Sequence, residues 1–256
     1  MRRVERAGPV VTITWDRREG RTSQVPSLWS ALAKIGAGLD SSTRAVVIRA
    51  AGPSFSGGLD RAMLTPEGVP GEPSLLTLAA DAGDALEEAI AHFQRGFAIW
   101  AEVPAITIAA VQGYAIGAGF QLALACDLRV VADDVAFAMR ETSLGLVPDL
   151  AGTSPLVRSI GYARALEICA TGRFVGAQEA VAIGLASRGG APRGPRRYGA
   201  RPRGRHTAGA SGRSARAEAV AAQRDGGFSL GSAQGRARGT GPASPRNRSG
   251  CVEVGP

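Results

Sequence analysis

Hydrophobic residues in the first part of the chain follow two patterns, one typical of buried strands and one typical of amphipathic helices. Short apolar runs at 10–15 (VVTITW) and 45–50 (AVVIRA) predict strands, and the second run is continuous enough to be buried on both faces of a sheet. Between them, apolar residues recur at helical spacing over 26–39. This strand, helix, strand order predicts an α/β domain.

The same two patterns continue to about residue 187. A stretch rich in proline and glycine at 65–73 predicts a loop. The remaining elements follow that loop. The expected strands are 103–111, 126–132 and 135–139, and the expected helices are 84–102, 117–125, 163–171 and 177–183.

Three segments in this region combine tight turns with polar or ionisable residues: 50–60 (AAGPSFSGGLD), 113–121 (GYAIGAGFQ) and 139–149 (MRETSLGLVPD). Glycines in the first let the backbone turn sharply after a strand and present bare N–H groups. The second begins a predicted helix, where unpaired N–H groups and the positive end of the helix dipole favour an anion. Two such turns that converge would form an oxyanion hole, and the third segment offers carboxyl groups beside it.

In this order and at these separations, the three segments resemble those of the crotonase superfamily, the enoyl-CoA hydratase/isomerase enzymes. The similarity runs from about Val4 to about Ala186 and includes the Cys126-Asp127 pair and the run 144–148 (LGLVP). An early family segment is similar at Asp16-Arg17, although Arg18 and Thr22 replace its proline and asparagine. The resemblance implies an α/β fold of repeated ββα units, a coenzyme A thioester as substrate, and no cofactor.

The resemblance also gives the two glycine-rich turns a role. Leu59 and Ala118 match the positions whose backbone N–H groups hold the thioester oxygen while negative charge develops on it. Arg17 and Arg21 are weaker candidates for contacts to CoA phosphates. The substrate-binding residues implied by the same match are Ser56, Gly57, Gly58, Asp60, Gly117 and Gly119.

The acid and base positions depart from the pattern of the family's hydratases, which use two glutamates. Glu141 matches one of them, but Gln121 stands at the other, and an amide does not exchange a proton at ordinary pH. Asp149 resembles a catalytic aspartate of related isomerases and dehalogenases, or else it caps the next helix. We therefore expect an isomerase-type proton transfer by Glu141, with Asp149 as partner or alternative base and with hydration disfavoured.

Composition changes abruptly after Ser187. Residues 188–256 hold 14 arginines against three acidic residues, with one leucine, no isoleucine and no lysine. This basic tail therefore carries a net charge of +11, whereas residues 1–187 carry −3, and the whole chain has +8. Such a low-complexity segment cannot bury enough apolar surface to fold. It is either a disordered tail or the product of a shifted reading frame in a GC-rich gene, and we favour the second because helical patterning stops in mid-domain.

The tail has consequences for assembly and partners. Crotonase-like enzymes continue with helices that cover the acyl pocket and pack between subunits of trimers or hexamers, and 188–256 has no apolar pattern to form them. An inactive acyl-CoA-binding protein therefore stays open as an alternative. A polyanion-binding protein is a second one, but nucleic acid is not expected because only Tyr198 and Phe228 offer rings for base stacking.

The cysteines and the hydropathy pattern bear on location. Cys126, Cys169 and Cys251 lack the spacing of zinc or redox motifs, which favours free thiols in a reducing compartment and predicts no metal site. No apolar stretch approaches the ~18 residues that a spanning helix needs. We expect a cytoplasmic protein without membrane contact.

Overall fold

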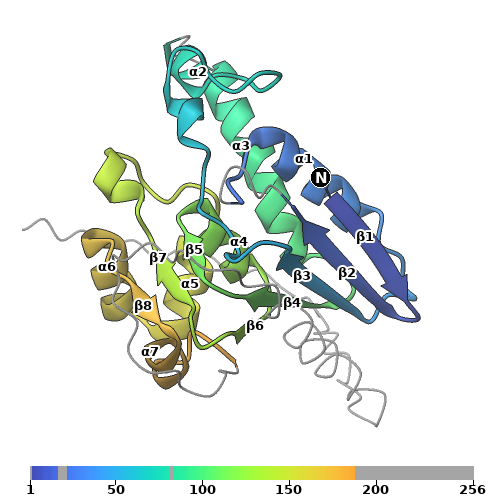
Figure 1. Ribbon diagram of the computed structural model, residues 1–256. Coiled ribbons are helices and arrows are strands. Elements are labelled where there is room, and N and C mark those ends of the chain that lie inside the picture. The colour runs from blue at the N-terminus through green and yellow to red at the C-terminus, as the bar shows by residue number, and fades with distance from the viewer. Residues whose placement is uncertain (1, 17–21, 81–83, 188–256) are drawn as a thin grey trace, which may run out of the picture. The chain divides into compact units, whose positions relative to one another are not determined.

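A five-stranded sheet forms the first layer of the fold (Figure 1). The structure is a computed structural model that describes residues 2–16, 22–80 and 84–187. The strand order is β1-β2-β3-β4-β6; β1 is antiparallel to β2, and the others run parallel. The strands are β1 (Arg2–Ala7), β2 (Val10–Trp15), β3 (Ala45–Ala50), β4 (Ile106–Val111) and β6 (Leu128–Val131).

A second, three-stranded sheet is built from β5 (Tyr114–Ile116), β7 (Ala136–Ala138) and β8 (Val175–Gly176), in the order β5-β7-β8. The chain crosses from the first sheet to the second twice, from β4 to β5 and from β6 to β7. Helix α4 (Ala118–Ala125) follows the first crossing. Each crossing places a tight turn where the carboxyl end of a parallel strand meets the second sheet.

Helices α1 and α3 pack closely against each other. A side chain on Gly96 of α3 would come within 2.6 Å of the Trp29 carbonyl oxygen of α1, so glycine permits this approach. The Trp29 ring also packs on Phe93 and Phe97. The helices besides α4 are α1 (Pro26–Ala37), α2 (Leu75–Ala80), α3 (Asp84–Ala98), α5 (Thr153–Ile160), α6 (Tyr162–Thr171) and α7 (Ala177–Ala182), and the short 3-10 helices are η2 (Arg61–Leu64), η3 (Ile99–Ala101) and η4 (Glu141–Leu144).

The expected elements are confirmed with changes at their ends. The strand expected from 103 begins at Ile106, and Pro104 lies in the turn before it. The helix expected to reach 102 ends at Ala98 and continues as the 3-10 helix η3. Asp149 does not cap the next helix, because α5 begins after Gly152 and has no side-chain cap.

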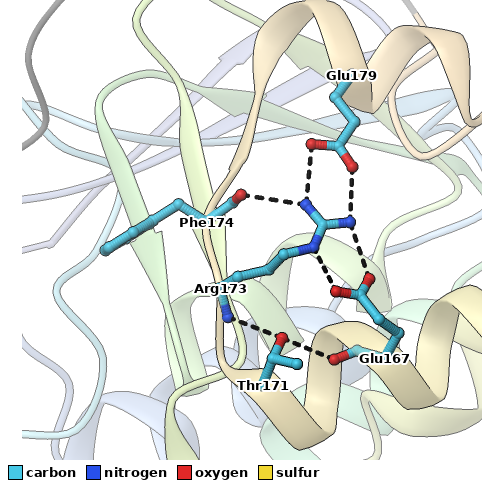
Figure 2. A network of polar contacts seen from close by, with 5 residues as sticks. All are labelled: Glu167, Thr171, Arg173, Phe174 and Glu179. Atoms are coloured by element: carbon cyan, nitrogen blue, oxygen red, sulfur yellow. Dashed lines mark hydrogen bonds and ion pairs between the residues drawn. The ribbon is translucent and has the colours of Figure 1, made fainter.

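Arg173 fastens the last described elements together (Figure 2). Its guanidinium donates to both carboxylate oxygens of Glu167 on α6, at 2.6 and 2.9 Å, and to both of Glu179 on α7, at 3.0 and 2.7 Å. These bonds raise the pKa of Arg173, and the same contact lowers the pKa of Glu167. These hydrogen bonds connect α6 to α7 and thereby hold the turn through β8 between the two helices.

All described residues belong to one unit, Met1–Arg224, and a second unit, Asp225–Pro256, lies outside them. The predicted basic tail, 188–256, also lies outside them, as do Arg17 and Arg21. Within the part of the chain that the structure describes, none of the helices is both long enough and apolar enough to cross a bilayer.

Candidate active site

The turn after β3 carries the first expected N–H donor. Gln24 and Leu59 face each other as a parallel bridge, in which the Gln24 N–H donates to the Gly58 carbonyl at 2.7 Å and the Asp60 N–H donates to the Gln24 carbonyl at 2.9 Å. In a parallel bridge the facing residue's own N–H points to the opposite side. The Leu59 N–H is therefore directed away from Gln24.

The second glycine-rich turn lies directly against the first. Ser56 bridges to Ala115 in β5, and a Cβ on Gly119 would come within 2.6 Å of the Ser56 Cβ. A Cβ on Gly58, where φ is +90°, would lie 2.6 Å from the Ile116 carbonyl oxygen and 3.8 Å from the Ala118 nitrogen. Both glycines are thus required for the approach that brings the peptide before Leu59 to the first residue of α4.

Two backbone N–H groups near this contact have no acceptor in the described part of the chain. Ala118 is the first residue of α4, and neither its N–H nor that of Leu59 donates to an acceptor among the described residues. Unpaired N–H groups at a helix start and in a tight turn are suited to a negative oxygen. The oxyanion hole expected from the sequence at Leu59 and Ala118 stays a prediction.

Glu141 and Gln121 meet next to this pair of donors. Glu141 is only 9% exposed, and its Oε1 accepts a hydrogen bond of 2.7 Å from Gln121 Nε2. A Cβ on Gly117, the residue before the Ala118 donor, would lie 3.3 Å from the same Glu141 Oε1. The second carboxyl oxygen, Oε2, is buried without a partner among the described residues.

Gln121 fixes which of the two Glu141 oxygens can carry a proton. The Gln121 Oε1 accepts from the backbone N–H groups of Leu150 and Gly152, at 2.9 and 3.1 Å, so its amide group must turn its N–H toward Glu141. Since Glu141 Oε1 is then held as an acceptor, a proton on this carboxyl belongs on Oε2. Burial is the main cause that raises the pKa of Glu141, with repulsion from Asp149 contributing.

Asp149 lies near enough to repel Glu141, but it is placed differently. More than a third of the surface of Asp149 stays exposed, and its backbone oxygen accepts a 2.6 Å hydrogen bond from Gln94 of α3. Partial burial raises the pKa of the Asp149 carboxyl as well. The segment therefore brings a second carboxyl to the neighbourhood of Glu141, while Gln94 fixes the backbone.

Ser56 and Asp60 are engaged with the protein itself. The Ser56 Oγ donates to the Thr22 carbonyl at 2.9 Å and accepts from the Gly58 N–H at 3.1 Å. The Asp60 carboxylate accepts from the Ala62 N–H at 3.1 Å and caps η2. Both side chains thereby hold the backbone on either side of Leu59.

Gln24 is the residue at this site that the sequence analysis missed. It is fully buried, its Nε2 donates to Ser56 Oγ at 3.1 Å, and its Oε1 accepts from Trp29 Nε1 at 2.8 Å. The signal in the sequence was a polar residue placed directly before the apolar start of the first helix. A buried glutamine needs such partners, but the partners lie in two other elements.

The other residues weighed from the sequence lie apart from this chemistry. His92 is exposed and hydrogen-bonds Ser30, and Cys126 is buried in the core, where burial raises the pKa of its thiol to about 12. Among the residues that the structure describes, no cluster of three or more His, Cys, Asp or Glu could hold a metal ion.

The chain is similar in sequence to proteins that carry the name of enoyl-CoA hydratases. A Bacillus subtilis protein named "Probable enoyl-CoA hydratase" is 36% identical over 150 residues, which are 59% of this chain and 53% of the relative. A Mycobacterium bovis protein named "Probable enoyl-CoA hydratase echA8" is 44% identical over 95 residues, 36% of this chain and 37% of the relative. The matches thus span about half or less of the length of these relatives.

Solved structures show the same fold. A structure described as "a putative enoyl-CoA hydratase from Thermobifida fusca YX in complex with acetoacetyl-CoA" is 40% identical, with a TM-score of 0.74, over 87% of this chain and 79% of that one. This similarity confirms the predicted crotonase-like α/β fold. A family model described as enoyl-CoA hydratase/isomerase matches residues 7–189. The chain therefore belongs to the enoyl-CoA hydratase/isomerase family.

Proposed function

We propose that the chain binds an acyl-CoA thioester and moves a carbon–carbon double bond by proton transfer, as an enoyl-CoA isomerase. The observation that carries this proposal is the pairing of a buried carboxyl, Glu141, with an amide, Gln121, at 2.7 Å. One carboxyl with one unpartnered oxygen can remove a proton and return it. It cannot alone supply the separate base and acid that addition of water uses.

The proposed reaction uses Glu141 Oε2 and the two backbone donors. With a 3-enoyl-CoA, ionised Oε2 takes a proton from C2, and the C2–H bonding pair becomes the double bond of an enolate whose charge lies on the thioester oxygen. The N–H groups of Leu59 and Ala118 stabilise that charge more than the neutral carbonyl. Glu141 then returns the proton at C4, and the double bond has moved from C3–C4 to C2–C3.

Solvent deuterium distinguishes isomerisation from hydration. The full chain is incubated in deuterated buffer with a 3-enoyl-CoA and, separately, a 2-enoyl-CoA, and the products are followed by mass spectrometry. We expect conversion of the 3-enoyl to the 2-enoyl thioester to be faster than gain of one water by the 2-enoyl thioester. Faster hydration that survives Glu141→Gln would refute the proposal, and binding without turnover would indicate an inactive acyl-CoA-binding protein.

Hydration is the second candidate, because relatives of this chain carry the name of hydratases. Replacing Gln121 by glutamate is expected to raise the hydration rate at least tenfold, at the low end of the roughly 10²–10⁴-fold effect of a positioned acid or base. One oxygen would keep the Leu150 and Gly152 donors, and the other would face Glu141 Oε1. Two carboxyls this close share a proton, which provides one acid and one base.

The measurement is the initial rate of water addition to a 2-enoyl-CoA by the Gln121→Glu variant and the wild-type chain. Gln121→Leu serves as control, since it removes the amide without adding a carboxyl. An unchanged hydration rate in a folded Gln121→Glu variant would show that Gln121 does not limit hydration in this chain.

A further inference from the structure

A buried line of hydrogen bonds runs from α1 to the turn that carries Leu59. Trp29 Nε1 donates to Gln24 Oε1 at 2.8 Å, and Gln24 Nε2 donates to Ser56 Oγ at 3.1 Å. The Ser56 Oγ in turn accepts from the Gly58 N–H at 3.1 Å. All three side chains are at most 2% exposed, so each bond lies away from water.

The Gln24 backbone holds the same turn from the side. Its N–H and carbonyl bond the residues before and after Leu59, Gly58 and Asp60, at 2.7 and 2.9 Å. Gln24 therefore contacts this turn through three polar groups: its backbone N–H, its backbone carbonyl and its side-chain Nε2. None of these groups contacts Leu59's own N–H, which is directed away from Gln24.

Burying the Gln24 amide costs hydration free energy, and packing alone does not require an amide at this position. A buried amide loses its hydration, which is compensated only where both its oxygen and its nitrogen are bonded. An apolar side chain of the same size would avoid that requirement. The anchor of the line is rigid, because the Trp29 ring packs on Phe93 and Phe97 of α3.

We infer that Gln24 is a positioning residue for the oxyanion hole: through Ser56 it sets the orientation of the Leu59 N–H toward the thioester oxygen. This inference rests on the proposed function, in which that N–H stabilises an enolate. Gln24 touches no reacting atom, and it acts through the turn alone. Small errors in the direction of such a donor reduce its effect on the transition state more than on the bound substrate.

The test combines kinetics with a direct probe of the thioester carbonyl. Gln24→Leu keeps the volume of the side chain and removes its hydrogen bonds. We expect kcat for isomerisation to fall about tenfold or more with a much smaller change in KM. Butyryl-CoA labelled with carbon-13 at its carbonyl cannot react, and its infrared carbonyl band should shift to lower frequency on the wild-type chain and shift less on Gln24→Leu.

Two further variants keep the test decisive. Ser56→Ala removes the same line at its next bond and serves if Gln24→Leu does not fold. Thr107→Val removes the buried Thr107 hydroxyl and its two hydrogen bonds with Asp127 at the far end of β4, and it should lower stability without altering the carbonyl band. A smaller shift in Thr107→Val as well would make the effect one of general stability and overturn the inference.

The wild-type result separates this inference from the proposal beneath it. If butyryl-CoA does not bind the wild-type chain, or binds with no carbonyl shift, the proposed oxyanion hole is wrong. If the wild-type chain shifts the band and folded Gln24→Leu and Ser56→Ala shift it equally, only the role of Gln24 is wrong.

Discussion

Glu141→Gln is expected to lower kcat for isomerisation by between about 10² and 10⁴-fold, because an amide cannot take the proton from C2. The replacement keeps the size of the side chain and can still accept from Gln121, so the backbone donors should be undisturbed. In the wild-type chain, kcat/KM should fall as the pH drops through the raised pKa of Glu141. Rates from pH 4 to 8 for both proteins, at about half-unit intervals, measure this. A variant with more than a tenth of wild-type kcat would exclude Glu141 as the base.

The same variant should be more stable than the wild-type chain at neutral pH. Burial raises the pKa of Glu141 in the folded state above its unfolded value, so folding favours the protonated carboxyl. The ionised carboxyl therefore costs stability above the folded pKa, and glutamine removes that cost. As the pH falls through the folded pKa and then the unfolded pKa of ~4.3, the advantage of the variant should disappear.

Glu167→Gln is the matched control for that pH dependence. Its hydrogen bonds to Arg173 lower the pKa of Glu167, so the sign is reversed. The ionised Glu167 contributes stability above its unfolded pKa, and that stability is lost as the pH falls through its lower folded pKa. Melting temperatures of the two variants should therefore differ from wild type in opposite directions at about pH 7 and converge on it in acid. If the two variants shift in the same direction at neutral pH, the assigned pKa direction of Glu141 is wrong.

The elements that the sequence predicted best are those determined by neighbouring residues. A continuous apolar run is sufficient to predict a buried strand such as β3, and the glycines before α4 predict a tight turn because glycine permits sharp backbone turns. β1 was missed because RRVERA has only two separated apolar residues, and its pairing with β2 supplies the rest of its stability. α5 was missed because TSPLVRSI is short and carries few apolar positions.

The contacts that define the site depend on residues far apart in the chain. The pairing of Gln121 with Glu141 joins α4 to η4, and no spacing rule indicates it. The sequence did identify both residues through the family resemblance, but not that Leu150 and Gly152 fix the orientation of the amide. No sequence motif identified Gln24, because its partners Trp29 and Ser56 come together with it only in the folded chain.

Gly58→Ala is expected to reduce kcat by about 10² to 10³-fold, the effect of losing one oxyanion donor. Gly58 has φ of +90°, and an added Cβ would lie 2.6 Å from the Ile116 carbonyl oxygen, which is backbone and cannot rotate away. The turn must therefore move, and the N–H of the next residue, Leu59, moves with it. The kinetics of 3-enoyl-CoA isomerisation and the infrared shift of bound butyryl-CoA measure the two consequences.

Gly8→Ala separates the clash from the backbone strain. Gly8 also has a positive φ, +57°, but a Cβ there meets nothing within 4 Å, in the turn between β1 and β2. It should cost about 1 kcal/mol of folding free energy for a left-handed alanine and leave kcat unchanged. A folded Gly58→Ala protein with kcat within a few-fold of wild type would mean that the thioester oxygen does not depend on the Leu59 N–H. Loss of activity in Gly8→Ala would instead assign the effect to general destabilisation, because this turn lies in another part of the fold and contacts neither donor.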